Sequence, residues 1–331
     1  MTLPALGRLR QAGEKIGVVA APAIAELARN HPWVDEVFVL DRTRGMLNNW
    51  RLARTIAREN YGTAFIFDGQ TRSIVTAALA GIKHRIGSCG LYPLGGAAPL
   101  FSRNIHLDGD PRLESQAVRC QRMAEAALGL GAAPTLRPPA PAVGPHDRSQ
   151  ADGLLAELNG DGPLIGLTLA GRQHEKSWPL AHFAQLCRRL HNECRARLFV
   201  TGGPSESVMA QARAQAAGVP VADFCGRTSL MAVIALAGRS DLFITIDTGT
   251  SHLAALTDTP LISLFIWTSP AQWPPQSPLV RILCYDWALS RFGLKPDDGP
   301  WKSAPVITPA MVFNTAAEML SITAKRGMIQ G

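Results

Sequence analysis

The chain has 331 residues, a length that suits two domains better than one hydrophobic core. Hydrophobic residues make up 47% and charged residues 18%, which excludes a disordered or fibrous chain, and no apolar run approaches the ~20 residues that cross a bilayer. The formal net charge of +7 favours anionic partners such as nucleotide phosphates, an acidic glycan or an anionic membrane surface. The basic and aromatic residues are scattered, which argues against nucleic-acid binding.

The first predicted element is a helix rather than a strand. In MTLPALGRLRQ three leucines recur at helical spacing, Thr2 can cap the helix and Pro4 suits its first turn. A predicted strand at 16–20 follows. Parallel α/β sheets usually begin with a strand. We therefore expect that a first strand is missing ahead of Met1.

Strand-like runs alternate with helical patterns through the first half of the chain. The expected strands lie at 16–20, 36–40, 64–67, 85–87 and 104–107. The expected helices lie at 23–29, 47–59, 72–80 and 111–128. Such alternation predicts a parallel sheet covered by helices on both faces.

A stretch rich in Pro, Gly and Ala separates the two halves, because it can hold neither a helix nor a central strand. We predict an N-terminal domain at 1–130, a linker at 131–149 and a C-terminal domain at 150–331. The alternation then restarts, with expected helices at 150–158, 180–191, 206–216, 230–237, 251–256 and 309–323. The expected strands lie at 164–169, 197–201, 220–223, 242–246 and 260–265, and an irregular Pro-rich stretch follows the last of them. Ligands of such paired domains bind between the carboxyl ends of the sheets.

The six cysteines are scattered, without any C-x-x-C pair, which fits a reducing compartment and buried thiols. The first helix is a poor signal peptide, because its basic residues follow its short apolar part. We expect a cytoplasmic protein.

The strongest chemical signal lies at 241–265, where a buried strand runs into Asp247, Thr248 and Gly249 and a helix begins at once. Backbone N–H groups and the positive end of the helix dipole suit a diphosphate there, and the carboxylate can accept from a sugar hydroxyl. His252 lies in the first helical turn. The alternative is an ordinary capped helix with a buried histidine.

Other strand–turn–helix junctions of the second half carry similar chemistry. Arg172 and Lys176 lie in a polar loop after a strand, where a phosphate would meet them, although the Walker spacing is absent. Glu206 follows Thr-Gly-Gly-Pro and can accept from a ribose diol. A Gly-Arg-Thr-Ser turn precedes the helix at 230–237. The alternatives are a solvated loop, a glutamate that complements a helix dipole and a plain helix cap.

Five ordered motifs resemble the heptosyltransferase family, glycosyltransferase family 9. They are K-x-W-P…F-A-x-L, T-G-G-P-x-E, G-R-T-S-L…A, D-T-G-x-x-H-L-A-A and T-P-x-x-x-L-F. The resemblance implies a type B glycosyltransferase fold, in which two Rossmann-like domains face each other across a cleft. It also implies an ADP-heptose donor and, as acceptor, a lipid-anchored saccharide of the lipopolysaccharide core or a related surface glycan. Peripheral contact with the cytoplasmic face of the inner membrane follows from that acceptor.

The resemblance also assigns roles to donor-binding residues. Lys176 would neutralise the diphosphate, Glu206 would hold the ribose and Asp247 would contact the transferred sugar. The remaining residues are phosphate contacts, a loop-shaping histidine and neighbours of the nucleoside, namely Thr248, Gly249, His252, Gly226, Thr228 and Ser229. The half of the chain predicted to bind the donor, 150–331, has no D-x-D pair, so we expect no protein-bound metal and no cofactor, while magnesium from solution on the diphosphate stays compatible with this site.

The chain departs from the family in two places. The turn at 266–270, Ile-Trp-Thr-Ser-Pro, is bulkier than the family's Gly-Pro-Thr type, which leaves the exact sugar open. The family's general base, an aspartate after the first strand, has no counterpart. Asp68 and Asp41 follow strands of the first domain and are weak replacements, and for Asp68 we favour a helix-capping or acceptor-binding role.

Three functions remain open on the sequence. The first is an inverting glycosyltransferase that uses heptose or another sugar. The second is a non-catalytic nucleotide-sugar-binding protein, because the base is absent. The third, an enzyme such as a nucleotide-sugar epimerase, would require an ordered set of cleft carboxylates and a histidine from both domains, which the sequence does not show.

Overall fold

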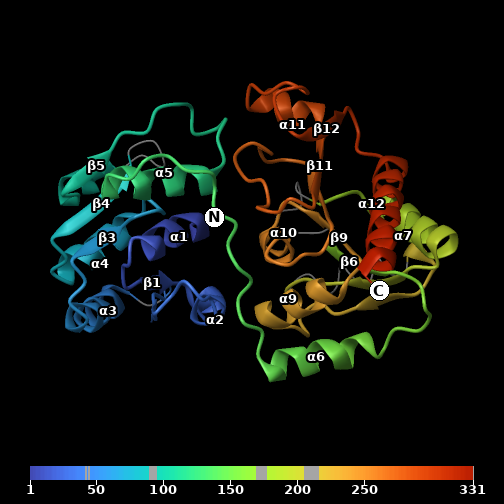
Figure 1. The fold of residues 1–331 in the computed structure, drawn as a ribbon, viewed down its shortest axis with the longest axis horizontal. Helices are drawn as coiled ribbons and strands as arrows, with labels where there is room; N and C mark the ends of the chain where they lie inside the picture. Colours follow the sequence, from blue (N-terminus) through green and yellow to red (C-terminus); the bar gives the residue numbers. More distant parts are fainter. Residues whose placement is uncertain (42, 44, 89–94, 169–176, 205–215, 331) are drawn as a thin grey trace. The chain divides into compact units, whose positions relative to one another are not determined.

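The computed structural model describes residues 1–41, 43, 45–88, 95–168, 177–204 and 216–330. The chain divides into two compact units, Met1–Ala142 and Val143–Gly331 (Figure 1). Each unit combines helices with strands that pair in parallel. The α/β class and the Rossmann-like character of both units are confirmed.

In the first unit, the strands form two separate parallel ladders. The strands are β1 (Gly17–Ala20), β2 (Glu36–Val39), β3 (Thr63–Phe65), β4 (His84–Ser88) and β5 (Arg103–Ile105). The helices are α1 (Leu3–Gln11), η1 (Pro22–Ile24), α2 (Ala25–Arg29), α3 (Met46–Arg58), α4 (Thr71–Leu79), η2 (Gly95–Leu100) and α5 (Gln116–Leu128). Among the described residues β1 pairs with β2, and β3, β4 and β5 pair in that order.

Helix α1 packs against α5 through small side chains. Ala5 of α1 contacts Cys120 and Ala124 of α5, and all three are buried. Thr2 was expected to cap α1, but its side chain makes no capping hydrogen bond. The reason is its helical backbone, with φ −81° and ψ −9°, because a capping residue needs an extended conformation to reach the first free N–H groups.

Helix α5 starts at Gln116, five residues later than the expected start at 111. Ser115 is its N-cap, and the hydroxyl accepts from the backbone N–H of Ala117 at 3.3 Å. Before it, Asp110 accepts from the backbone N–H of Arg112 at 2.8 Å and closes a turn. The expected helix was too long at its N-terminus. The apolar periodicity extends back to residue 111, whereas the side-chain cap at Ser115 makes the helical conformation begin only at Gln116.

The second unit contains one larger parallel sheet. Its strands are β6 (Leu164–Thr168), β7 (Arg197–Val200), β8 (Val221–Asp223), β9 (Leu242–Ile246), β10 (Leu261–Phe265), β11 (Val280–Tyr285) and β12 (Trp301–Ala304). Its helices are α6 (Pro145–Leu155), α7 (Leu180–Cys194), α9 (Leu230–Arg239), α10 (Gly249–Ala254), α11 (Asp286–Arg291) and α12 (Pro309–Gln330). In the described residues the strand order is β12-β11-β10-β9-β6-β7-β8.

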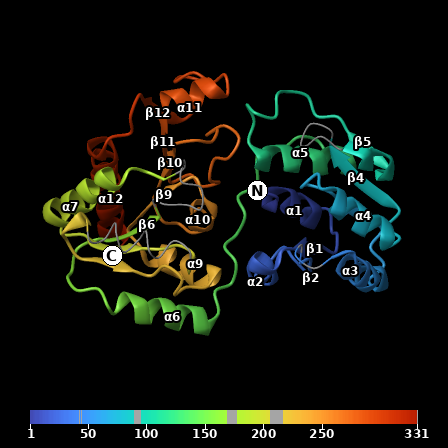
Figure 2. The same ribbon diagram turned by 180° about the vertical axis from the view of Figure 1, so that it is seen from behind.

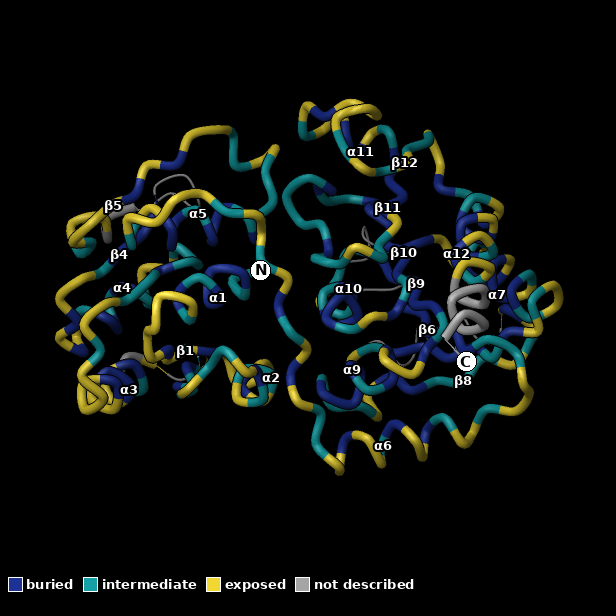
Figure 3. The backbone as a smooth tube through the Cα atoms, in the orientation of Figure 1, coloured by how far each residue is buried: buried dark blue, intermediate teal, exposed yellow. Residues whose placement is uncertain are grey.

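Helices cover both faces of this sheet. Figures 1 and 2 show α7 and α12 side by side, and α6 beside α9. Strand β9 alternates accordingly: Leu242, Ile244 and Ile246 belong to the core that includes α7 and α12, whereas Phe243 belongs to the core under α6, α9 and α10. Strands β6, β9 and β10 are buried along their whole length, which Figure 3 shows in dark blue.

The expected linker at 131–149 was too long at its C-terminal end. Helix α6 begins at Pro145, because proline fits the first turn of a helix, where its missing N–H costs nothing. The preceding segment is attached to the first unit. The backbone N–H of Leu136 donates to Gln121 at 3.0 Å, and that of Ala142 donates to the carbonyl of Asn30 at 2.8 Å.

The stretch after β10, expected to be irregular, contains β11, α11 and β12. Strand β11 has an apolar sequence, VRILCY, and pairs in parallel with β10. The prolines between β10 and β11 conceal this strand from a reading of local composition. No described helix in the chain is both long enough and apolar enough to cross a membrane.

Candidate functional site

The candidate site of the second unit lies at the carboxyl edge of its sheet. Because all strands of the sheet run in parallel, their last residues meet at one edge, where ligands of such sheets bind. Thr168 ends β6 and Thr201 follows β7, and their hydroxyl oxygens lie 2.8 Å apart. The predicted contacts Arg172, Lys176 and Glu206 lie in 169–176 and 205–215, outside the described residues.

Asp247 stands at the tip of β9, as the sequence predicts. Its backbone N–H donates to the carbonyl of Leu264 at 3.1 Å, which ties it to β10. The hydroxyl of Thr268 donates to its carboxylate. The side chain is therefore held at the sheet edge, and it is partly exposed there.

Thr268 is the contact that sequence reasoning missed. It lies three residues beyond the end of β10 and 21 residues after Asp247. The signal was present, because Thr268 belongs to the Ile-Trp-Thr-Ser-Pro turn that departs from the family pattern. The parallel pairing of β9 with β10 brings the two side chains together.

The turn after Asp247 opens directly into α10. Thr248 occupies the N-cap position with an extended backbone, yet its side chain makes no capping hydrogen bond. Gly249 is exposed. Ser251 is buried, and its hydroxyl lies 3.1 Å from that of Ser263 on β10, which fixes α10 to the sheet. The plain capped helix was expected to use Asp247 or Thr248 as its cap, and the structure excludes the Thr248 side chain from that role.

His252 is neutral at neutral pH. Burial lowers the pKa of its ring to about 3, because the surrounding protein disfavours the charged imidazolium. The ring can therefore shape the loop and take part in hydrogen bonds, but it adds no positive charge for a diphosphate.

The turn between β8 and α9 packs against the turn after β7. Gly226 has φ +72°, and its N–H donates to the carbonyl of Gly202 at 2.9 Å. A Cβ atom at this position would lie 3.0 Å from the Cα of Pro204. Glycine is required here for both reasons, the left-handed backbone and the close approach. Gly226 and Thr228 are thereby presented at the same sheet edge as Asp247.

Ser229 has a structural task. Its hydroxyl accepts from the backbone N–H of Ala232 at 2.9 Å and so caps α9. The same hydroxyl donates to Asp147 of α6 at 2.6 Å. This side chain is already engaged in the fold, where it holds the turn that carries Gly226 and Thr228.

Asp68 in the first unit is engaged in the same way. Its carboxylate accepts from the backbone N–H of Gln70 at 3.1 Å and from the hydroxyl of Ser73 at 2.7 Å. These contacts tie the turn before α4 to the first turn of the helix, although the N-cap position itself belongs to Gln70, which has no side-chain cap. A role of Asp68 as base or as acceptor contact stays a prediction. Asp41 likewise accepts from the N–H and the hydroxyl of Thr43, at 3.0 and 2.6 Å.

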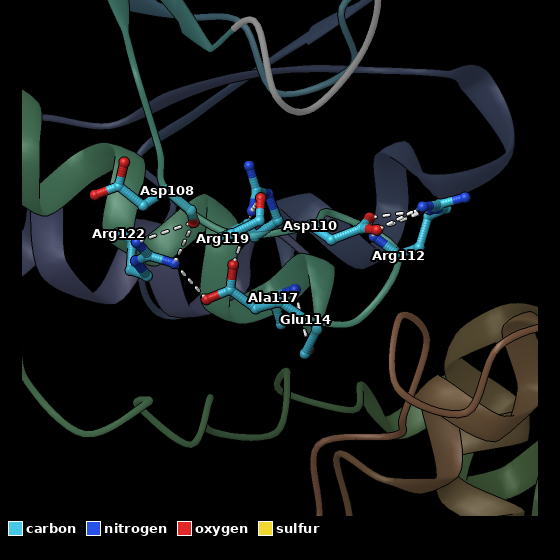
Figure 4. A network of polar contacts seen from close by, with 9 residues as sticks. Asp108, Asp110, Arg112, Glu114, Ala117, Arg119 and Arg122 are labelled. Carbon is cyan, nitrogen blue, oxygen red and sulfur yellow. Dashed lines mark hydrogen bonds and ion pairs between the residues drawn. The ribbon is translucent and has the colours of Figure 1, made fainter. Parts of the chain in front are cut away.

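A charged network precedes and enters α5 of the first unit, and sequence reasoning did not single it out. Figure 4 shows the carboxylate of Glu114 between two arginines, 3.0 Å from Arg119 and 2.7 Å from Arg122. Arg119 is fully buried, and its Nε and Nη2 atoms have no hydrogen-bond partner in the described structure. Glu114 is thus the carboxylate that compensates a buried charge.

Metal ligands do not gather in the described part of the chain, where no three His, Cys, Asp or Glu side chains come together as a potential metal site. The expectation that the reaction needs no protein-bound metal stays a prediction.

Comparison with known proteins agrees with this architecture. The model of Glycosyltransferase family 9 (heptosyltransferase) matches residues 49–292. Lipooligosaccharide heptosyltransferase 2 of Haemophilus influenzae is 30% identical over 172 residues, an alignment that spans 50% of this chain and 49% of that protein. Lipopolysaccharide heptosyltransferase 2 of Salmonella typhimurium is 25% identical over 81% of this chain and 78% of its own length.

The fold is similar to that of a solved heptosyltransferase. The structure of E. coli ADP-heptose lps heptosyltransferase II superposes with a TM-score of 0.76 and 22% identity, covering 96% of this chain and 94% of that one. This likeness supports the type B glycosyltransferase fold. Because the family model matches well over half of the sequence, the chain belongs to glycosyltransferase family 9, the heptosyltransferase family.

Proposed function

We propose that the chain is an inverting heptosyltransferase that moves a heptose from ADP-heptose to an acceptor of the lipopolysaccharide core or a related surface glycan. The observation that carries this proposal is the junction between β9 and α10 in a member of the heptosyltransferase family. There Asp247, Thr248 and Gly249 stand together at the carboxyl edge of a parallel sheet. The names of the relatives, which are lipopolysaccharide and lipooligosaccharide heptosyltransferases, support heptose as the transferred sugar and the acceptor class. The name of the similar solved structure includes ADP-heptose, which supports the donor.

In this proposal the sheet edge binds the donor along its length. Asp247 accepts hydrogen bonds from hydroxyls of the transferred sugar, and Thr248 and Gly249 contact the diphosphate through the hydroxyl and the backbone. Gly226 and Thr228 lie next to the nucleoside. The neutral ring of His252 keeps the loop in shape without charge.

The proposed chemistry is a single displacement. A hydroxyl of the acceptor attacks the anomeric carbon, the bond from that carbon to the diphosphate oxygen breaks, ADP leaves with the bonding electrons, and the hydroxyl proton passes to solvent. Arg172 and Lys176 stabilise the charge that develops on the leaving diphosphate, and Glu206 holds the ribose. The reaction uses no protein-bound metal or cofactor, and magnesium from solution on the diphosphate is compatible with it. We assign no catalytic base, because the carboxylate of Asp68 holds α4.

The proposal includes a cytoplasmic location with peripheral contact to the inner membrane, where a lipid-anchored acceptor is presented. The net charge of +7 supports attraction to an anionic membrane surface.

The test measures ADP release and acceptor mass with ADP-heptose and lipopolysaccharide from cells blocked before heptose addition. We expect transfer by the wild-type chain, loss of transfer in Asp247→Asn and full transfer in the control Asp161→Asn, which lies before the amino end of β6. Binding of ADP-heptose without transfer would favour the non-catalytic nucleotide-sugar-binding protein. Transfer from another ADP-sugar alone would change the sugar, and a lack of any binding would refute the donor assignment.

A further inference from the structure

An aromatic cluster stands beside Asp247 at the carboxyl edge of the second unit. Trp267 follows β10, and Trp287 lies in α11, directly after β11. Their ring centroids are 5.3 Å apart at an interplanar angle of 67°. The guanidinium carbon of Arg291 lies 4.3 Å from the centroid of the Trp267 ring.

Trp267 of this cluster is linked through the next residue to Asp247, the proposed sugar contact. Trp267 precedes Thr268, whose hydroxyl donates to the carboxylate of Asp247. Strand β10 lies between β9 and β11 in the sheet, so the residues that follow these three strands are neighbours along its edge. A change at Trp267 is therefore transmitted to Asp247 through one residue and one hydrogen bond.

Helix α11 presents Trp287 toward solvent from a fixed base. The next two residues, Ala288 and Leu289, are buried in separate cores of this unit, which anchors the helix. Trp287 itself stays 39% exposed, although an indole ring is one of the largest apolar groups a protein can bury. Part of the apolar ring surface of Trp287 is therefore open to contact with a ligand.

The order of strands indicates which part of a donor would reach this cluster. The proposed nucleoside contacts follow β8, the diphosphate contacts follow β9, and the aromatic cluster follows β10 and β11. Four strand spacings separate β8 from β10, which is roughly 19 Å at ~4.8 Å per strand. An extended nucleoside diphosphate sugar runs along such a line with its sugar last, next to Trp267.

We propose that Trp267, Trp287 and Arg291 form the wall of the subsite for the transferred sugar, an inference that rests on the proposed function. A sugar ring has an apolar C–H face, which packs on the exposed indole of Trp287, and peripheral hydroxyls, which Asp247 binds. Arg291 stacks on Trp267 and holds that ring in place by a cation–π contact. The wall makes this member of the family selective for the shape of the sugar.

The test compares the binding of ADP and of ADP-heptose by isothermal titration calorimetry on the full chain. We expect Trp287→Ala to weaken ADP-heptose binding about tenfold while ADP binding is unchanged, because only the sugar contacts the wall. Trp287→Phe, which keeps a ring, restores most of the affinity and guards against a folding defect. The matched control is Trp50→Ala, since Trp50 of α3 is 50% exposed and has Arg54 stacked 4.7 Å from its ring.

The outcomes separate this inference from the proposed function. If the wild-type chain binds neither ADP nor ADP-heptose, the proposed donor is wrong and the sugar wall falls with it. If the wild-type chain binds both, and Trp287→Ala keeps the preference for ADP-heptose or weakens both ligands equally, the wall is wrong while the donor assignment stands. Loss of binding to anionic lipid vesicles in Trp287→Ala, with ADP-heptose binding intact, would identify a lipid contact and also overturn the wall.

Discussion

Removal of the Glu114 carboxylate should destabilise helix α5 in the first unit. Glu114 contacts Arg119 at 3.0 Å and Arg122 at 2.7 Å. Arg119 is fully buried, and two of its three guanidinium nitrogens already lack partners in the described structure. Glu114→Ala leaves that guanidinium with only a long contact, 3.5 Å, to the carbonyl of Gly109.

The expected cost is about 3 kcal/mol, the lower end of the range for one half of a buried ion pair, because Glu114 is itself partly exposed. Glu114→Gln keeps an acceptor oxygen and should cost less. The double variant Glu114→Ala/Arg119→Met should recover most of the loss, since it removes the buried charge together with its partner. The matched control is Asp110→Ala, because Asp110 pairs with the exposed Arg112 and solvent screens such a pair, so that it contributes little to stability.

Hydrogen exchange of peptides that cover α5 is the suitable measurement, because a chain of two units need not unfold in one step. Exchange in α5 should be roughly 100-fold faster in Glu114→Ala than in the wild type, which corresponds to that free energy. If Glu114→Ala and Asp110→Ala accelerate exchange equally, or if the double variant is no better than the single one, Glu114 does not compensate a buried Arg119.

Three further predictions concern the second unit and its turns. Gly226→Ala should lower the free energy of unfolding by about 1–2 kcal/mol, because an alanine is strained in the left-handed backbone of this position. Its Cβ would also displace Pro204, whose Cα is 3.0 Å away, and we expect ADP binding to weaken as a result. The control Gly109→Ala (φ +94°) has no atom near its Cβ and should show the backbone strain alone. ADP affinities unaltered by Gly226→Ala would contradict the packing of the two turns. Because the pKa of His252 is about 3 in the folded chain and 6.5 in the unfolded one, the unfolded state binds more protons between these values, and stability should fall as pH drops below 6.5. Between pH 6.5 and 5 this loss of stability is at most about 2 kcal/mol, and it should be absent in His252→Gln. Thermal denaturation of the wild type and the variant at both pH values measures the loss. Equal losses in the two proteins would refute the prediction. Burial raises the pKa of the Cys187 thiol to about 12, so iodoacetamide at pH 8 should modify it only after unfolding, and mass spectrometry of native labelling decides this.

The local sequence pattern was sufficient to predict the bounds of a strand that is buried along its whole length. Strand β9 was expected at 242–246 and is observed at Leu242–Ile246, because a buried apolar run bounded by aspartates has few other solutions. The start of α5 and the strands β11 and β12 were missed for a different reason. Side-chain capping by Ser115 and the pairing of β11 with β10 depend on contacts that composition and periodicity do not describe.

The same distinction between local pattern and tertiary contacts holds for the residues of the candidate site. The alternation of strands and helices, together with the polar turns that follow the strands, was sufficient to indicate an α/β fold and to locate Asp247, Thr248 and Gly249 at a strand end. Tertiary contacts decided which polar side chains are already hydrogen-bonded within the fold. Ser229 bonds to Asp147, 82 residues away, and Thr268 bonds to Asp247, 21 residues away. Sheet order and helix packing bring such partners together, and a hydrogen bond between distant residues leaves no periodic trace in the sequence.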